Sequence, residues 1–167
     1  MANLLINGGK PLSGTIIPSG NKNAVLPILC ATVLTDETVI LRNVPNITDV
    51  QKVVRFLGAM GSEITWDQAA GVLRINNAAF HDELGDVPLP AGMRSAVLLL
   101  PALLRRVGTI KFSNTKGCAL GVRELDPHID ALGTLGVRVV EDEPITLELN
   151  DGFKGGRLWL DYMSVTT

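Results

Sequence analysis

The chain has 167 residues, a formal net charge of -2 and an apolar fraction of 46%, whereas aromatic residues make up only 4%. A chain of this size and composition can bury a real core, as one domain or as a large part of one. The sequence shows neither a basic stripe nor a set of stacking aromatic residues, which excludes nucleic acid as an expected partner.

The first half of the chain predicts a strand, a helix, a strand, a helix and two further strands, in that order. The first helix is buried and tolerates Pro27, which we expect near its first turn. A capping box, Thr48-Asp49-Val50-Gln51, opens the second helix, and Gly61 closes it as a C-terminal cap. In chain order, the predicted elements are the strand 15–18, the helix 23–34, the strand 38–42, the helix 48–61 and the strands 63–66 and 72–76.

The second half repeats this order. Gly20, before the first helix, corresponds to Gly92, and Leu57 corresponds to Leu132 in an equivalent Leu-Gly motif. Asp126 is expected to cap the second helix of this unit, with Pro127 at the first helical position. The predicted elements of the second unit are the strand 87–89, a helix after Gly92, the strand 109–113, a helix from Asp126 and the strands 137–141 and 145–149.

A third unit is predicted to begin near the end of the sequence. Residues 156–161 are typical of its first strand and residues 162–165 of the loop that follows. Repeat units bury their faces against one another, so an unfinished unit predicts exposed apolar surface. We therefore expect that the chain is a fragment, or that self-association or a further chain completes the unit.

The two cysteines lie in different predicted settings. Cys118 lies in a loop with glycines and a cation on either side, Lys116-Gly117-Cys118-Ala119-Leu120-Gly121-Val122-Arg123. Glycines allow close approach to a ligand and nearby cations favour the thiolate, so this loop predicts a reactive cysteine. Glycine-rich loops also serve simply as connections. Cys30 lies on the apolar helix and is predicted to be structural and inert.

No disulfide framework or cleavable signal region is predicted, so a reducing cytoplasm is the expected location. The longest apolar run, 95–104, is interrupted by Pro101 and is too short to span a bilayer, so no membrane partner is expected. The histidines His81 and His128 lie far apart without supporting cysteines or carboxylates, so no metal site is predicted.

Four short motifs, taken in their order and spacing along the chain, together resemble those of the enolpyruvyl transferases. The resemblance is to the bacterial ones that act on UDP-N-acetylglucosamine. In that family, two domains close on the substrates, and each is an inside-out α/β prism of three repeats. The resemblance implies that residues 1–21 belong to the second domain and that residues 22–167 form a partial first domain of about two βαβαββ repeats, with a third begun. The motifs are Ser19-Gly20-Asn21-Lys22-Asn23-Ala24, Met93-Arg94, Gly117 to Arg123 with Asp126 and His128, and Asp161 with Ser164-Val165.

The resemblance also implies a reaction. The enolpyruvyl group of phosphoenolpyruvate would pass to a hydroxyl of UDP-N-acetylglucosamine by addition and then elimination of phosphate, without a cofactor, as the first committed step of peptidoglycan precursor synthesis. Cys118 would be the general acid that protonates the methylene carbon, and it can also add covalently. Lys22, Arg94 and Arg123 would bind the phosphoenolpyruvate anion. The nucleotide sugar would contact Asn23, Arg123, Asp126, His128, Ser164 and Val165.

Each candidate also has a structural interpretation. A purely structural role for both Lys22 and Arg94 is disfavoured, because a helix start disfavours a cation. Arg123 could pair with neighbouring carboxylates on the surface, Asn23 could serve only as a helix-start residue, and His128 could be packed or solvated. Met60 and Met93 are interpreted as core residues.

Departures from the family pattern fall in the part expected to touch the nucleotide, at Glu124, Leu125, Tyr162 and Thr166, so the donor is better supported than the acceptor. A different nucleotide, a non-catalytic nucleotide-binding module and a purely structural repeat protein stay open. A cysteine hydrolase is disfavoured, because nothing predicts contact between Cys118 and His128. The family's catalytic carboxylate would lie beyond Thr167, so we expect this polypeptide alone to be inactive.

Overall fold

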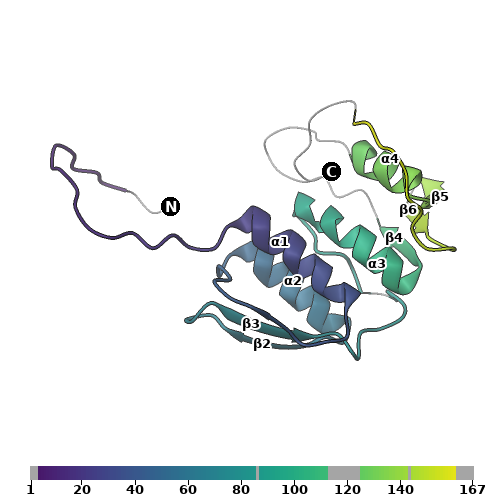
Figure 1. The fold of residues 1–167 in the computed structure, drawn as a ribbon, viewed down its shortest axis with the longest axis horizontal. Coiled ribbons are helices and arrows are strands. Elements are labelled where there is room, and N and C mark those ends of the chain that lie inside the picture. Colours follow the sequence, from purple (N-terminus) through teal and green to yellow (C-terminus); the bar gives the residue numbers. More distant parts are fainter. Residues whose placement is uncertain (1–3, 86, 113–124, 143, 161–167) are drawn as a thin grey trace.

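A computed structural model describes residues 4–85, 87–112, 125–142 and 144–160, except for the side chains of Arg94 and Asp142 (Figure 1). The elements of the first unit are α1 (Lys22–Ala31), the 3-10 helix η1 (Thr32–Leu34), β1 (Val39–Leu41), α2 (Thr48–Ala59), β2 (Glu63–Asp67) and β3 (Val72–Asn76). Those of the second unit are the 3-10 helix η2 (Arg94–Leu99), α3 (Leu100–Val107), β4 (Thr109–Phe112), α4 (Asp126–Thr134), β5 (Arg138–Asp142) and β6 (Ile145–Glu148).

The two units form two antiparallel sheets with the same topology. The strand order is β1-β3-β2 in the first sheet and β4-β6-β5 in the second, so the last strand of each unit lies between the other two. In the first sheet Arg74 pairs with both Ile40 and Thr65, and in the second Leu147 pairs with both Ile110 and Val139. The predicted sequence repeat is therefore confirmed as a structural repeat.

The second helix of each unit also ends in the same way. The N–H of Ser62 donates to the carbonyl of Leu57 over 3.0 Å, and the N–H of Val137 donates to the carbonyl of Leu132 over 3.0 Å. This is the bond pattern of a Schellman motif, which requires a residue with positive φ just before the donor. Gly61 supplies it with φ +93°, so its predicted role as a C-terminal cap is confirmed.

The predicted first strand of each unit is wrong. Residues 15–18, 87–89 and 156–160 lie outside any strand among the described residues. An extended segment becomes a strand only when its backbone N–H and C=O groups pair with a neighbouring segment, and these three segments belong to neither described sheet. The observed unit is therefore helix, strand, helix, strand, strand.

Two predicted helix starts are displaced by one residue. The carbonyl of Ile47 accepts the N–H of Gln51 over 3.0 Å, which makes Ile47 the N-cap of α2 and leaves the predicted capping box unformed. In the same way Leu125 is the N-cap of α4, and Asp126 is its first helical residue rather than its cap. In both helices the cap position carries an apolar side chain that makes no capping hydrogen bond.

Each of the two buried helices contains a proline. Pro27 lies inside α1, in its second turn rather than near its first, where it has no N–H to donate to the preceding turn. In the second unit Pro101 lies in the first turn of α3, and the residues before it form the 3-10 helix η2. The buried apolar helix predicted over 95–104 is thus present, but as a 3-10 segment followed by an α-helix.

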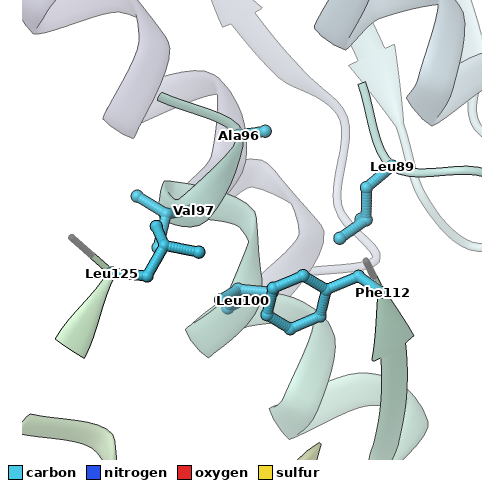
Figure 2. A pocket seen from close by; sticks show the side chains of 6 residues that line it. All are labelled: Leu89, Ala96, Val97, Leu100, Phe112 and Leu125. Carbon is cyan, nitrogen blue, oxygen red and sulfur yellow. The ribbon is translucent and has the colours of Figure 1, made fainter. Parts of the chain in front are cut away.

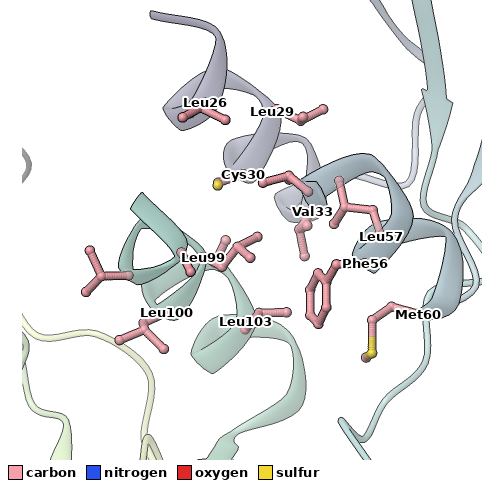
Figure 3. Close-up of a cluster of buried hydrophobic side chains, with 14 of the residues drawn as sticks. Leu26, Leu29, Cys30, Val33, Phe56, Leu57, Met60, Leu99, Leu100 and Leu103 are labelled. Atoms are coloured by element: carbon pink, nitrogen blue, oxygen red, sulfur yellow. The ribbon is translucent and has the colours of Figure 1, made fainter. Parts of the chain in front are cut away.

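The core lies where α1, α2 and α3 pack together, and the two sheets cover its outer sides (Figures 1 and 3). Met60 and Met93 are buried in it, which confirms their interpretation as core residues. No helix in the described residues is long and apolar enough to cross a membrane. The core side chains labelled in Figure 3 are Leu26, Leu29, Cys30, Val33, Phe56, Leu57, Met60, Leu99, Leu100 and Leu103.

A buried amide joins the ends of the helices. Asn77, just after β3, is fully buried, and its amide nitrogen donates to the carbonyl of Thr32 over 2.7 Å. Its amide oxygen accepts from the hydroxyl of Ser62, which follows α2, over 2.6 Å. Its backbone carbonyl accepts from the guanidinium of Arg106, near the end of α3, over 2.7 Å. One residue therefore connects the C-terminal ends of α1-η1, α2 and α3.

Replacing Asn77 should cost far more stability than replacing its neighbour. Asn77→Ala leaves two buried partners without their hydrogen bonds, so we expect the free energy of unfolding to fall by about 2–4 kcal/mol. Asn76→Ala, the matched control, removes a partly exposed amide and should cost about 1 kcal/mol or less. Urea unfolding followed by tryptophan fluorescence measures both. Equal losses would contradict the central role of Asn77.

Candidate functional site

The first candidate residues lie at the start of α1. Asn21 is the N-cap of this helix, and its side-chain oxygen accepts the N–H of Asn23 over 2.7 Å. Because Asn21 makes the cap, capping does not explain Asn23, whose side chain is exposed. The ammonium of Lys22, the first helical residue, contacts the carboxylate of Asp49 in the first turn of α2. Lys22 and Asn23 are therefore held at an exposed edge where α1 and α2 begin.

Gly20 fixes the direction in which the chain reaches α1. A Cβ at this position would lie 1.9 Å from the carbonyl oxygen of Asn43 and 2.9 Å from the Cδ of Pro45. Neither distance is possible for a real side chain, so only glycine allows this approach. The connection between β1 and α2 therefore packs directly against the segment that leads to Lys22.

The helix of the second unit begins beside the same edge. Arg94 is the first residue of η2, and Ala91 and Gly92 lead into it. The ammonium of Lys52 in α2 donates to the carbonyl of Ala91 over 2.8 Å. Helices α1 and η2 also pack against each other. The starts of α1, α2 and η2 therefore converge, and two of them carry the cations that the sequence predicts for anion binding.

An apolar pocket lies between residues of η2 and two residues that come just before and just after segment 113–124 in the sequence (Figure 2). Phe112 ends β4 and Leu125 immediately precedes α4, and both line this pocket. Ala96 and Val97 of η2 also line it, and Val97 lies beside Leu125. The two residues that flank segment 113–124 are thus anchored beside the helix that begins at Arg94.

Four of the predicted site residues lie outside the described part of the chain. They are Cys118, Arg123, Ser164 and Val165. The other two residues of the predicted nucleotide pocket are at the start of α4, where Asp126 is exposed and His128 is buried with 6% of its surface accessible. The structure therefore agrees with the packed interpretation of His128. The part of the chain that the structure describes shows no group of three or more histidine, cysteine, aspartate or glutamate residues suited to a metal.

The edge where the three helices begin favours a negatively charged ligand. The first N–H groups of a helix lack partners within the helix and carry a partial positive charge, so helix starts commonly bind phosphate and carboxylate groups. The exposed ammonium of Lys22 adds a full positive charge at the same edge. The charges at this edge therefore suit an anion better than a neutral or a positively charged ligand.

Asp49 and Lys52 belong to this edge, although sequence reasoning did not single them out. Both are charged residues on one amphipathic helix, an arrangement that usually indicates only a solvated face. Their spacing of three residues does place them on the same face of a helix. That spacing is the one signal that could have drawn attention to the pair.

Cys30 is excluded from chemistry by its surroundings. Its thiol is buried between the core helices, and this burial raises its pKa to about 12 (Figure 3). At neutral pH the group is therefore a thiol rather than a nucleophilic thiolate. The prediction that Cys30 is structural is confirmed.

Comparisons with known proteins identify the fold and the family. Residues 6–166 match the family described as EPSP synthase (3-phosphoshikimate 1-carboxyvinyltransferase). The chain is 39% identical over 175 residues to UDP-N-acetylglucosamine 1-carboxyvinyltransferase from Coxiella burnetii (strain Dugway 5J108-111), a match that covers 99% of this chain and 38% of that protein. The crystal structure of the enolpyruvyl transferase NikO from Streptomyces tendae superposes with a TM-score of 0.69 and 23% identity, covering 87% of this chain and 32% of that one.

The fold is therefore that of part of an enolpyruvyl transferase, built from repeated α/β units. The chain belongs to the EPSP synthase family. It spans about 38% of the length of the Coxiella protein. The resemblance inferred from the motifs is confirmed at the level of family and fold.

The close approach at Gly20 predicts a localised defect when a methyl group is added. Gly20→Ala should lower the free energy of unfolding by about 1–3 kcal/mol, because the backbone of Asn43 cannot move away without disturbing the β1-α2 connection. Hydrogen exchange at the amide of Asn23 should accelerate with it. Gly8→Ala is the control, since a Cβ there meets nothing within 4 Å. Indistinguishable variants would contradict the constraint.

The raised pKa of Cys30 predicts protection from alkylation. In a Cys118→Ser background, iodoacetamide at about pH 8 should leave the folded chain unlabelled and should label it once guanidinium has unfolded it. Above the ordinary pKa near 9, the unfolded chain loses the Cys30 proton while the folded chain keeps it, so stability should fall as the pH rises from about 9 to 12. Intact mass and denaturant titration report the two effects, and rapid labelling of the folded chain would overturn the assignment.

Proposed function

We propose that this chain contributes the phosphoenolpyruvate-binding part of an enzyme that transfers the enolpyruvyl group to a hydroxyl of UDP-N-acetylglucosamine. The observation that carries the proposal is the convergence of helix starts at Lys22 and η2, in a chain that belongs to a carboxyvinyl transferase family. Phosphoenolpyruvate carries a phosphate and a carboxylate. An edge that gathers cations and helix starts matches this ligand better than it matches a neutral one.

In the proposed reaction the acceptor oxygen bonds to C2 of phosphoenolpyruvate while the C3 methylene gains a proton. The tetrahedral adduct then loses phosphate and a proton from C3, which restores the double bond in the product. Cys118 would deliver the first proton, and Lys22, Arg94 and Arg123 would hold the donor's negative charges. The acceptor proton needs a base, which the family resemblance assigns to residues beyond Thr167.

We assign the acceptor from the Coxiella relative, whose name specifies UDP-N-acetylglucosamine. Asn23, beside Lys22, would contact the sugar, and Asp126, His128, Ser164 and Val165 would line the nucleotide pocket together with Arg123. The exposure of Asn23 and Asp126 supports roles in ligand contact. The burial of His128 supports an indirect role, in which it packs beneath the start of α4.

Residues 1–21 would form part of a second domain that completes the substrate cleft. In the described structure residues 4–17 extend away from the helices, and their large apolar side chains are 78–98% exposed (Figure 1). A segment of this kind is stable only when its apolar side chains are covered. This exposure supports the assignment of residues 22–167 to a separate, partial first domain.

The proposal predicts a covalent adduct at one thiol. Incubation with phosphoenolpyruvate should add the mass of the ligand to the wild-type chain and add nothing to Cys118→Ser, and Lys22→Met should lower the yield because it removes an anion contact. Intact mass spectrometry with and without UDP-N-acetylglucosamine measures this. We expect no acceptor-dependent phosphate release from the chain alone. An adduct that forms equally in Cys118→Ser would contradict the proposed role of the thiol.

A further inference from the structure

The N-terminal part of α2 contacts the start of α1 and the segment that leads to η2. Asp49 lies in that turn, and its carboxylate contacts the ammonium of Lys22 at the start of α1. Lys52, three residues further along, donates to the carbonyl of Ala91 over 2.8 Å. Ala91 lies three residues before Arg94, the first residue of η2. One helical turn therefore holds both segments that are proposed to bind the donor.

Stability alone does not account for this arrangement. The side chain of Lys22 is 52% exposed and that of Asp49 is 21% exposed. Ion pairs of this kind contribute only about 0–1 kcal/mol. A lysine at the first helical position also faces the positive end of the helix dipole, so α1 by itself disfavours the charge. The contact with Asp49 offsets that repulsion and fixes where the ammonium lies.

The geometry leaves Lys22 able to bind a second anion. An ammonium group carries three donors, and the contact with Asp49 occupies only one side of it. Asp49 is itself placed favourably, because a carboxylate in the first turn of α2 faces the positive end of that helix. The carboxylate is therefore a fixed anchor, and the more exposed lysine is oriented by it.

We propose that Asp49 and Lys52 are positioning residues, which hold Lys22 and the segment before Arg94 in place for an anionic donor. This inference rests on the proposed function, because it takes phosphoenolpyruvate to bind at these helix starts. The inference predicts the direction in which the affinity for the anion changes when Asp49 is replaced. If Asp49 acted only as a nearby negative charge, its removal would strengthen anion binding, whereas the loss of an orienting partner weakens it.

The first test compares two variants that each remove one negative charge. Asp49→Asn is the test variant. Glu141→Gln is the matched control, since Glu141 forms an exposed ion pair with Lys111 in the second sheet, over 3.1 Å. Isothermal titration of the full chain with phosphoenolpyruvate gives the affinities. We expect Asp49→Asn to weaken binding about fivefold and Glu141→Gln to leave it unchanged within about twofold.

The second test removes one positive charge in each of two places. Lys52→Met should weaken phosphoenolpyruvate binding about fivefold more than Lys111→Met does, and Lys52→Arg should restore most of the loss because it keeps a charged donor. The thermal midpoints of the two methionine variants should agree within about 2 °C. A loss of affinity in Lys52→Met without a matching loss of thermal stability would indicate a positioning role rather than a structural one.

The outcomes distinguish the inference from the function on which it rests. A wild-type chain that does not bind phosphoenolpyruvate would contradict the proposed function and this inference with it. If the wild type binds, unchanged or tighter binding by Asp49→Asn would overturn the positioning role alone. A Lys52→Met variant that loses affinity only in proportion to its stability would overturn the role of Lys52.

Discussion

The buried amide of Asn77 is the contact on which the arrangement of the core depends. The side-chain nitrogen of Asn77 donates to Thr32 at the end of α1, and its side-chain oxygen accepts from Ser62 after α2. Its backbone carbonyl accepts from the guanidinium of Arg106 near the end of α3. Arg106 also forms an ion pair with Asp36 over 2.7 Å and lies over the ring of Phe80 at 5.6 Å. A buried polar group is costly unless it is satisfied, so the partners of the buried Asn77 favour one arrangement of the three helices.

Joining the helix ends also determines where the helices begin. Their C-terminal ends meet at Asn77, and α1 packs against both α2 and η2, so the helices also begin near one another. The contacts of Lys22 with Asp49 and of Lys52 with Ala91 lie at that side. The position of the candidate site therefore depends on how the core helices are joined at their C-terminal ends, as well as on the close approach at Gly20.

The sequence predicts the elements that carry a strong local signal. The core helices, the paired strands at the end of each unit and the turn at Gly61 follow from apolar periodicity and glycine chemistry, and all are present. The predicted strand at 15–18 is absent, because pairing is a tertiary property that β propensity alone cannot guarantee. Lys22 is predicted from a motif, whereas Asp49 becomes part of the site only because two helices meet, and no spacing in the sequence reveals that meeting.

The starts of three helices at one edge bring their partial positive charges together, and an anion at that edge would reduce the repulsion between them. Parallel helices place their positive ends together, and Lys22 adds a further positive charge where repulsion is already greatest. Asp49 compensates part of this charge at the starts of α1 and α2. A bound anion at this edge would compensate more of the charge. A ligand that binds the folded chain at this edge, and does not bind the unfolded chain, would therefore add to the stability that the core provides.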